Sequence, residues 1–362
     1  GTTFGKTHLA RAVEDIAPFV VMQEEQFDES PTYFELTATA GFGAFAVDAV
    51  DVAVIEVGLG GRYDATNVVD AAVSVITGIA IDHTSYLGDT QAEIAAEKAA
   101  ILKEGGAIVT GPLGSEASDA VAARVRETSA TWHPAPESFR VVSAERDERG
   151  WQVEVQGIYD DYDDLVLGIH GRHQVTHLAT AIAACEAFFG RALDGDAVRE
   201  AAATARSPGR LEVAGLSPPV LIDGAHNDEG LRGLAAALEE EFVEDSWTLV
   251  LGMRGDRDVG RLIEPLRGKV DNVVATEADD QLAVPAAEVA AAAEQALGVP
   301  AKVVTPVSAA IDSAMASVAD GTGVAIAGSL YVVGEARHAL GLDNAPSPVH
   351  RRFEAQIEAD YE

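Results

Sequence analysis

Positive charge, cysteine and long apolar runs are all scarce in this chain of 362 residues. It contains five lysines and a single cysteine, Cys185, which lies in an apolar helical run and is expected to be a small core residue. One cysteine excludes a disulfide framework, which suits a cytosolic protein. No apolar run reaches the length of a membrane span and no cleavable signal is visible, so the sequence predicts a cytoplasmic protein that does not bind membranes.

Acidic residues dominate the composition. Asp and Glu number 59 against 25 Lys and Arg, which gives a formal net charge of −34. The negative electrostatic field of such a chain repels polyanions, so nucleic acid and anionic membranes are not expected as partners. An acidic, lysine-poor surface keeps a protein soluble where salt screens its self-repulsion, which predicts a halophilic source.

The first part of the chain predicts a parallel sheet with helices. The nearly continuous β-branched runs 50–58 and 72–83 are typical of parallel strands buried on both faces, and 107–111 predicts a third strand. Thr90 and Glu93 form a capping-box signature at the start of the helix between the second and third runs.

The rest of the chain predicts two further parts. Residues 139–170 alternate polar and apolar, which predicts a small antiparallel insert. After SPGR (207–210), five apolar runs alternate with helical patterns, which is typical of a doubly wound, Rossmann-like α/β domain. We therefore predict a central domain over 1–206 that includes the insert, a C-terminal domain over 207–341 and a tail over 342–362.

Polar side chains end both early apolar runs. Glu56 ends the first run and Asp82-His83 ends the second. Because the carboxyl ends of parallel strands meet at one rim, these side chains are expected in one crevice. A carboxylate there can hold Mg²⁺ against a nucleotide's phosphates, and an imidazole can complete the shell of oxygens. The alternatives are a Glu that faces solvent and a structural His.

Lys98 is out of place on an apolar helix face. It shares that face with Ile94, Ile101 and Leu102. Burial lowers the pKa of an amine and makes it nucleophilic, so that it can even take up CO₂ as a carbamate. The alternative is that the long side chain snorkels to water.

Polar residues also follow apolar runs in the predicted C-terminal domain. Asp223 and His226 lie directly after one run, and Gly224 between them lets the backbone approach a ligand closely. Gly328 and Ser329 lie where a later run turns into a helix N-terminus, which is a natural anion site. Loop geometry alone would also explain the glycines.

The first seven residues, GTTFGKT, match a phosphate-binding loop only loosely. The Walker pattern G-x-x-x-x-G-K-[ST] places one more residue between its glycines than separates Gly1 from Gly5. A helix follows, since Leu9 and Val13 begin an apolar repeat at helical spacing. A surface turn before a helix is therefore predicted.

From about Ser30 to Arg337 the ordered motifs of the chain resemble those of the folylpolyglutamate synthase/dihydrofolate synthase branch of the Mur ligase family. These motifs are EVGLGGRYDATNVVD, IDHTSYLGDT, EKAAILK, GRHQ, SPGRLEV, LIDGAHNDEG, GDRD and GSLYVVGEAR. The resemblance implies a Mur-ligase-like central ATPase domain and a C-terminal glutamate-ligase domain. It also implies a monomeric enzyme that uses ATP and Mg²⁺ to join L-glutamate to the carboxylate of dihydropteroate or a folate derivative, through an acyl phosphate.

The same resemblance assigns roles in the central domain. Glu56 and His83 match magnesium ligands, and Lys98 matches the lysine that the family carbamylates. The residues that match the pteridine-holding segments are Thr32, Tyr33, Phe34, Glu35, Tyr63, Asp64 and Ala65. A flat, polar-edged heterocycle suits an aromatic platform and a carboxylate acceptor.

The ATP-contacting positions fall mainly in the predicted C-terminal domain. Arg210 and Asp223 match them, and His226 lies beside them. His177 matches a position that touches the adenine, where the family usually has Asn. A histidine can still donate one hydrogen bond there.

The resemblance implies one departure at the start of the chain. The family's phosphate loop, G-T-x-G-K-[GS], lies well upstream of Glu56, whereas GTTFGKT matches the variable turn before the helix that leads to residues 32–35. We therefore expect the family's loop to be missing, through gene truncation, a misplaced start codon or partial coverage. The alternatives left open are a Mur ligase for another carboxylate and a catalytically dead remnant that only binds partners. Dihydropteroate and folylpolyglutamate specificity are also not distinguished.

Overall fold

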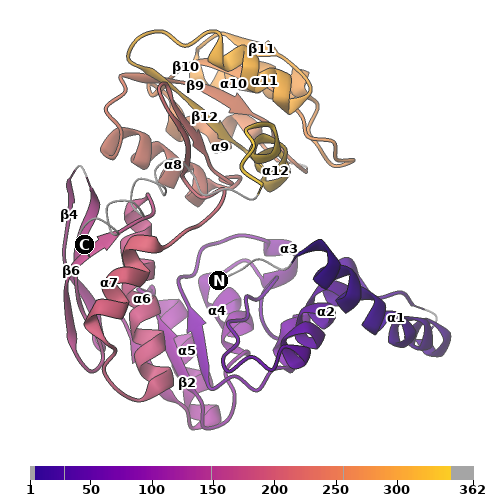
Figure 1. Cartoon of the computed structure of the whole chain (residues 1–362), viewed down its shortest axis with the longest axis vertical. Helices are drawn as coiled ribbons and strands as arrows, with labels where there is room; N and C mark the ends of the chain where they lie inside the picture. The colour runs from indigo at the N-terminus through magenta and orange to yellow at the C-terminus, as the bar shows by residue number, and fades with distance from the viewer. Residues whose placement is uncertain (1–4, 28, 148, 256, 344–362) are drawn as a thin grey trace. The chain divides into compact units, whose positions relative to one another are not determined.

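The computed structural model describes residues 5–27, 29–147, 149–255 and 257–343. The chain divides into two compact units, residues 1–132 (unit 1) and 133–362 (unit 2), whose elements are labelled in Figure 1. The domain boundary predicted at residue 206 falls inside unit 2. Most of the predicted tail and the first four residues of GTTFGKT lie outside the described residues.

Unit 1 starts with two helices and continues into a small sheet. Its strand order is β1-β2-β3, and β1 runs parallel to β2 with Val73 opposite Ala107. Thr90 and Glu93 form the predicted capping box at the start of α4. The elements are α1 (Lys6–Phe27), α2 (Tyr33–Val47), η1 (Ala65–Val68), β1 (Val73–Ile76), α3 (Thr84–Leu87), α4 (Gln91–Ala99), β2 (Ala107–Thr110), α5 (Ser115–Thr128) and β3 (Thr131–Pro134).

Two strand predictions in unit 1 need correction. Residues 50–58 form no strand in the described structure. An apolar run becomes a strand only when a neighbouring strand supplies ladder hydrogen bonds. Residues 50–58 have no such partner among the described strands, and Val54 is 92% exposed. The second run pairs over fewer residues than predicted, because β1 ends at Ile76. Asp82-His83 therefore lies beyond the strand end, directly before α3.

Small residues join the first two helices of unit 1. Ala12 and Ile16 of α1 pack against Ala40 and Ala44 of α2. Leu9 is 54% exposed, so only part of the predicted apolar stripe of α1 is buried. A separate cluster lies under the sheet and is formed by Ile76, Ala99, Leu102, Ile108 and Val121.

Unit 2 begins with the predicted antiparallel insert. Its strands, in the order β4-β5-β6, are β4 (Arg140–Asp147), β5 (Gly150–Gln156) and β6 (Asp161–Leu167), and they are followed by α6 (Arg172–Phe189) and α7 (Gly195–Thr204). The prediction that Cys185 is a core residue is wrong, because its side chain is exposed. The buried face of α6 is formed by Ala179, Ile182, Ala183 and Glu186, and it leaves Cys185 outside.

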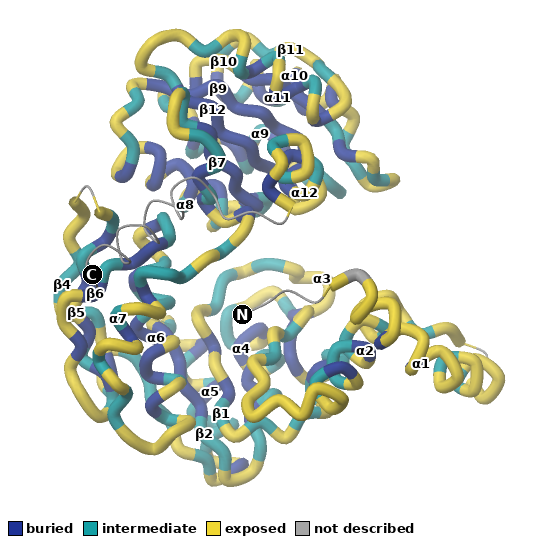
Figure 2. Tube along the Cα trace, in the orientation of Figure 1, coloured by how far each residue is buried: buried dark blue, intermediate teal, exposed yellow. Residues whose placement is uncertain are grey.

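The remainder of unit 2 is the predicted doubly wound domain. Its sheet has the order β11-β10-β9-β12-β8-β7 and is parallel except for β7, which runs antiparallel to β8 and was not predicted. The elements are β7 (Glu212–Leu216), β8 (Pro219–Ile222), α8 (Asp228–Glu240), β9 (Ser246–Leu251), α9 (Val259–Ile263), η2 (Glu264–Leu266), β10 (Val270–Ala275), α10 (Ala286–Leu297), β11 (Ala301–Val303), α11 (Val307–Met315), β12 (Thr322–Ala327) and α12 (Leu330–Ala339). In Figure 2 this sheet is the most extensively buried part of unit 2.

Two apolar clusters, one on each face of this sheet, fix where its crevice lies. Leu231, Leu234 and other residues of α8, α9 and α10 form one cluster, whereas Val307, Val332 and other residues of α11 and α12 form the other. β12 lies between β8 and β9, yet its helix covers the face opposite to theirs. The carboxyl ends of these three strands therefore border the switch point at which such sheets bind ligands. We call the residues that directly follow β8, β9, β10 and β12 the carboxyl rim.

A buried carboxylate ties α8 to the insert. Glu241, just after α8, accepts hydrogen bonds from the indole N–H of Trp151 (3.2 Å) and the backbone N–H of Gly171 (2.8 Å), and it contacts His170 Nδ1 (3.0 Å). Burial is the largest influence on its pKa and acts upward, but these hydrogen bonds together hold the pKa of Glu241 below its ordinary value. Arg146 of β4 completes the cluster at 3.5 Å.

We predict that Glu241→Ala destabilises the chain by about 3–5 kcal/mol, because removing one partner leaves buried donors unpaired. The neighbouring exposed Glu240→Ala is the matched control and should change the free energy of unfolding by less than about 0.5 kcal/mol. Urea unfolding measures both. A lowered folded pKa means that the contribution of Glu241 is present above the ordinary carboxyl pKa and is lost as the pH falls through the folded value. Equal stability of the two variants would contradict this role.

Candidate functional site

Asp223 is the organising side chain of the carboxyl rim. It follows β8, and its Oδ2 accepts the backbone N–H of Leu211 while its Oδ1 accepts that of Ala225, both at 2.7 Å. Burial raises the pKa of Asp223 above its ordinary value, although the two backbone donors favour the charged form. The carboxylate thereby joins the loop 207–211 to the loop 223–227.

A second carboxylate holds the other side of Arg210. Glu212 accepts the backbone N–H of Gly209 at 2.8 Å and forms an ion pair with Arg337 of α12. Gly209 and Leu211 both have positive φ, +70° and +46°, so the chain turns sharply on each side of Arg210. Leucine rarely adopts this conformation, and the bond from its N–H to Asp223 stabilises it. Glu212 and Arg337 lie in motifs that the sequence singled out, but their pairing is not readable from a linear pattern.

Gly224 shows how close Arg210 lies to the loop after β8. A Cβ at Gly224 would meet Arg210 Nη1 at 3.0 Å and Leu330 Cδ2 at 2.6 Å, so a larger residue there would displace the ends of these two side chains. His226 Nδ1 contacts the carbonyl oxygen of Gly224 at 2.7 Å, and Arg257 donates to the carbonyl oxygen of His226 at 2.6 Å. The structure thus brings together three of the predicted nucleotide residues, Arg210, Asp223 and His226.

The fourth predicted nucleotide residue, His177, lies on α6. Its ring meets that of His173 edge-on with centroids 5.6 Å apart, and its Nδ1 lies 3.1 Å from Gln174 Oε1. Burial lowers the pKa of both histidines, and His177 and Arg210 lower that of His173 further. His177 is therefore linked to the Arg210 neighbourhood through His173.

In unit 1 the loop after Glu56 contacts the elements that carry the other predicted residues. A Cβ at Gly58 would meet the ring of Phe34 at 2.4 Å, and one at Gly60 would meet Leu87 of α3 at 2.8 Å. A Cβ at Gly61 would meet the carbonyl oxygen of Lys98 at 2.9 Å. These glycines let the loop 58–64 lie directly against the start of α2 and the ends of α3 and α4.

Several predicted substrate residues use their polar groups to shape this loop. Asp64 accepts the backbone N–H groups of Leu59 (2.8 Å) and Thr66 (2.9 Å). Thr32 and Glu35 form a capping box at the start of α2, and its hydrogen bonds lower the pKa of Glu35. Tyr63, in contrast, is 90% exposed and Tyr33 83% exposed, which leaves both rings accessible.

The predicted metal ligands of unit 1 do not form a closed site. Glu56 and His83 are exposed, and Lys98, in the last turn of α4, is partly buried. Neither Glu56 nor Lys98 forms a side-chain hydrogen bond or ion pair with any residue that the structure describes. Within the described ranges, no group of three or more His, Cys, Asp or Glu side chains could hold a metal ion.

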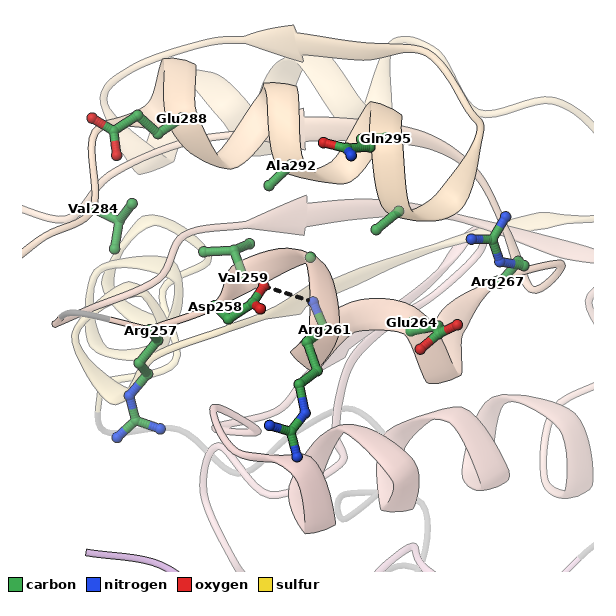
Figure 3. A pocket seen from close by; sticks show the side chains of 12 residues that line it. Arg257, Asp258, Val259, Arg261, Glu264, Arg267, Val284, Glu288, Ala292 and Gln295 are labelled. Atoms are coloured by element: carbon green, nitrogen blue, oxygen red, sulfur yellow. Dashed lines mark hydrogen bonds between the residues drawn. The ribbon is translucent and has the colours of Figure 1, made fainter.

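In unit 2, a cavity of 520 Å³ lies between α9 and α10 (Figure 3). Its lining includes Arg257, Arg261 and Arg267, but also Asp258, Glu264 and Glu288. These charges balance, so the cavity has no preference for an anion. Separately, no helix among the described residues is long and apolar enough to cross a membrane.

We predict that Asp223→Asn destabilises the chain by about 1–3 kcal/mol. The amide replaces one acceptor oxygen, so either Leu211 or Ala225 loses its hydrogen bond inside the protein. Asp228→Asn, at an exposed position five residues on, is the matched control. Urea unfolding of both variants at one pH provides the comparison. An unfolding midpoint of Asp223→Asn equal to that of the wild-type chain would refute the stabilising role of these two hydrogen bonds.

Comparisons with known proteins show which proteins the chain resembles. Residues 209–330 match the protein-family model described as "Mur ligase, glutamate ligase domain". The dihydrofolate synthase/folylpolyglutamate synthase of Mycobacterium tuberculosis is 37% identical over 95% of this chain and 77% of its own length. A probable bifunctional folylpolyglutamate synthase/dihydropteroate synthase of Halobacterium salinarum is 34% identical over 93% of this chain and 41% of its own.

Solved structures give the same result. The M. tuberculosis folylpolyglutamate synthase complexed with ADP superposes with a TM-score of 0.88 at 36% identity, over 94% of this chain and 79% of that one. The Escherichia coli FolC complex with DHPP and ADP gives a TM-score of 0.81 at 27% identity, over 95% of this chain and 78% of that one. The chain therefore belongs to the dihydrofolate synthase/folylpolyglutamate synthase family of Mur-type ligases.

Proposed function

We propose that this chain catalyses the ATP-dependent addition of L-glutamate to the carboxylate of a pteroate or folate derivative. The observation that carries the proposal is the pair of rim loops that Asp223 joins around Arg210, in the domain that matches a glutamate ligase. The γ-phosphoryl group of ATP passes to the acid to give an acyl phosphate and ADP. The amine of glutamate then attacks the acyl carbon, loses a proton and expels phosphate.

The nucleotide is held by Arg210, Asp223, His177 and His226. Arg210 has an exposed side chain on a backbone that is fixed on both sides, so little loop ordering remains to be done on binding. The lowered pKa of His177 keeps its ring neutral near pH 7, and a neutral ring can both donate and accept a hydrogen bond at an adenine edge.

The acid substrate is held by Thr32, Tyr33, Phe34, Glu35, Tyr63, Asp64 and Ala65 in unit 1. Tyr33 and Tyr63 present exposed rings on which a flat heterocycle can stack. Phe34 and Asp64 act differently, because Phe34 lies against Gly58 and Asp64 binds the backbone of its own loop. Their role is to position that loop.

Glu56 and His83 are the residues that would hold Mg²⁺. Their number fits this ion, which is usually bound by one or two protein ligands together with substrate phosphates and water. The exposed Glu56 carboxylate has no competing hydrogen bond within the described structure, which supports the assignment. When bound, the ion would neutralise charge on the transferring phosphoryl group.

Lys98 is proposed to react with CO₂ through its neutral amine, which forms an N–C bond and releases one proton. The product is a carbamate that presents two oxygens in place of an ammonium group. Lys98 is partly buried, makes no ion pair with a described residue, and its backbone touches the loop after Glu56. The carbamate would therefore add a negative charge beside the proposed metal ligands.

Isotope transfer tests the proposed reaction. Dihydropteroate or folate labelled with ¹⁸O in its terminal carboxylate is incubated with ATP, Mg²⁺ and glutamate, using the 362-residue chain and any longer form that its gene encodes. An acyl phosphate route transfers one ¹⁸O to phosphate for each amide bond formed. No amide product with either acid, or a product without ¹⁸O in the phosphate, would refute the proposal.

Lys98→Ala should lose most of the ligase activity, and short carboxylic acids such as acetate should restore part of it by replacing the carbamate. Lys103→Ala is the matched control, since Lys103 donates to Asn67 (2.7 Å to its carbonyl oxygen) outside the proposed metal site. Activity is measured as amide product per enzyme. Wild-type activity of Lys98→Ala, or no rescue at any acetate concentration, would exclude the carbamate.

A further inference from the structure

Arg254 follows β9 on the carboxyl rim and is stacked on an aromatic ring. Its guanidinium carbon lies 4.6 Å from the ring centroid of Tyr331, in the first turn of α12. Its Nε donates to Asp280 Oδ2 at 2.5 Å. The stack and the ion pair hold the guanidinium in one plane, which is the main requirement for two-point binding of a planar anion.

The backbone around Arg254 is also held. Gly255 donates its N–H to the carbonyl oxygen of Leu282 (2.8 Å), and Val284 donates to that of Met253 (2.9 Å). An antiparallel bridge joins Arg254 to Ala283 between these two bonds. The rim segments after β9 and β10 are thus paired, so the position of Arg254 does not depend on a free loop.

The terminal nitrogens of Arg254 remain available to a ligand. Among the described residues its one polar partner is Asp280, through Nε, and neither Nη atom donates a hydrogen bond there. The side chain is 38% exposed, whereas that of Asp280 is 13% exposed. The exposed end of the guanidinium is therefore the end that carries unused donors.

Arg254 and Arg210 lie on either side of the start of α12. Leu330 and Arg210 both lie next to Gly224. The residue after Leu330 is Tyr331, on whose ring Arg254 stacks. Both arginines thus border the switch point of the sheet, where β12 lies between β8 and β9. The carboxyl side of this sheet thus presents two guanidinium groups in a chain whose net charge is −34.

We propose that Arg254 binds a carboxylate of the incoming L-glutamate. This inference rests on the proposed function. Free glutamate carries two carboxylates and one ammonium group, so it is an anion that the negative electrostatic field of the chain repels. A fixed guanidinium group offsets this repulsion at the place where the amino acid binds. The ion pair with Asp280 offsets part of the positive charge of Arg254, which suits one carboxylate better than a triphosphate.

Calorimetric titration of L-glutamate into the full chain, with Mg²⁺ and the ATP analogue AMPPCP present, tests the proposal. Arg254→Gln should weaken glutamate binding about 10- to 100-fold, the range for a lost charge-assisted two-point contact. Arg254→Lys should recover only part of it, because an ammonium group lacks the planar fork. The affinity for AMPPCP should stay within about twofold of wild type in both variants.

Arg232→Gln is the matched control. Arg232 on α8 also pairs with an aspartate through Nε (2.8 Å to Asp228), so the variant removes the same charge and the same kind of ion pair from an exposed helix. Tyr331→Phe should keep glutamate binding, whereas Tyr331→Leu should weaken it, because only the leucine removes the aromatic platform. Thermal unfolding confirms that each variant is folded.

The two amides of glutamate identify the carboxylate. Glutamine lacks the γ-carboxylate and isoglutamine lacks the α-carboxylate. Arg254→Gln should bind one of these two amides as tightly as it binds glutamate, and either result supports the proposal. Wild-type glutamate affinity in Arg254→Gln, or weakening by Arg232→Gln to the same extent, would overturn it. Glutamate binding that depends on Arg254 in a chain without ligase activity would refute the proposed function and leave the Arg254 site intact.

Discussion

The loops that we propose to bind substrates depend on one interaction, a carboxylate that accepts backbone N–H groups. Asp223 holds Leu211 and Ala225 in this way, and Asp64 holds Leu59 and Thr66. A buried unpaired N–H costs about 1–3 kcal/mol, so Asp223 fixes the path of loops that have no ladder or helix to satisfy these groups. The geometry at both proposed substrate-binding regions therefore follows from where a few acids lie.

This interaction has a consequence for the charge balance of the site. The chain has more than twice as many acids as bases, 59 against 25, and acids satisfied by the backbone do not occupy its scarce cations. Arg210 and Arg254 consequently keep guanidinium donors available at the rim, although many carboxylates surround them. Glu212 and Glu241 differ, since each takes both a backbone N–H and an arginine.

Local and periodic features could be predicted from the sequence, whereas pairing could not. The alternation of apolar runs and helices predicted the C-terminal sheet, and Thr90 with Glu93 predicted the start of α4, because both signals lie within a few residues. The run 50–58 has the composition of a strand but no ladder partner among the described residues, and composition does not report on partners. Cys185 lies beside the buried face of α6 and not on it, a distinction that depends on tertiary contacts. The hydrogen bond from Leu211 to Asp223 joins segments twelve residues apart, and the stack of Arg254 on Tyr331 joins the residues after β9 to those after β12. Neither contact follows from a motif.

Amide hydrogen exchange measures the central interaction directly. In the full chain under native conditions, the amides of Leu211 and Ala225 should exchange slowly although both lie in loops, because each N–H is bonded to a buried carboxylate. Their protection should fall in Asp223→Asn while that of β8 persists. Exchange at the rate of an open loop in the wild-type chain, with β8 protected, would contradict the account.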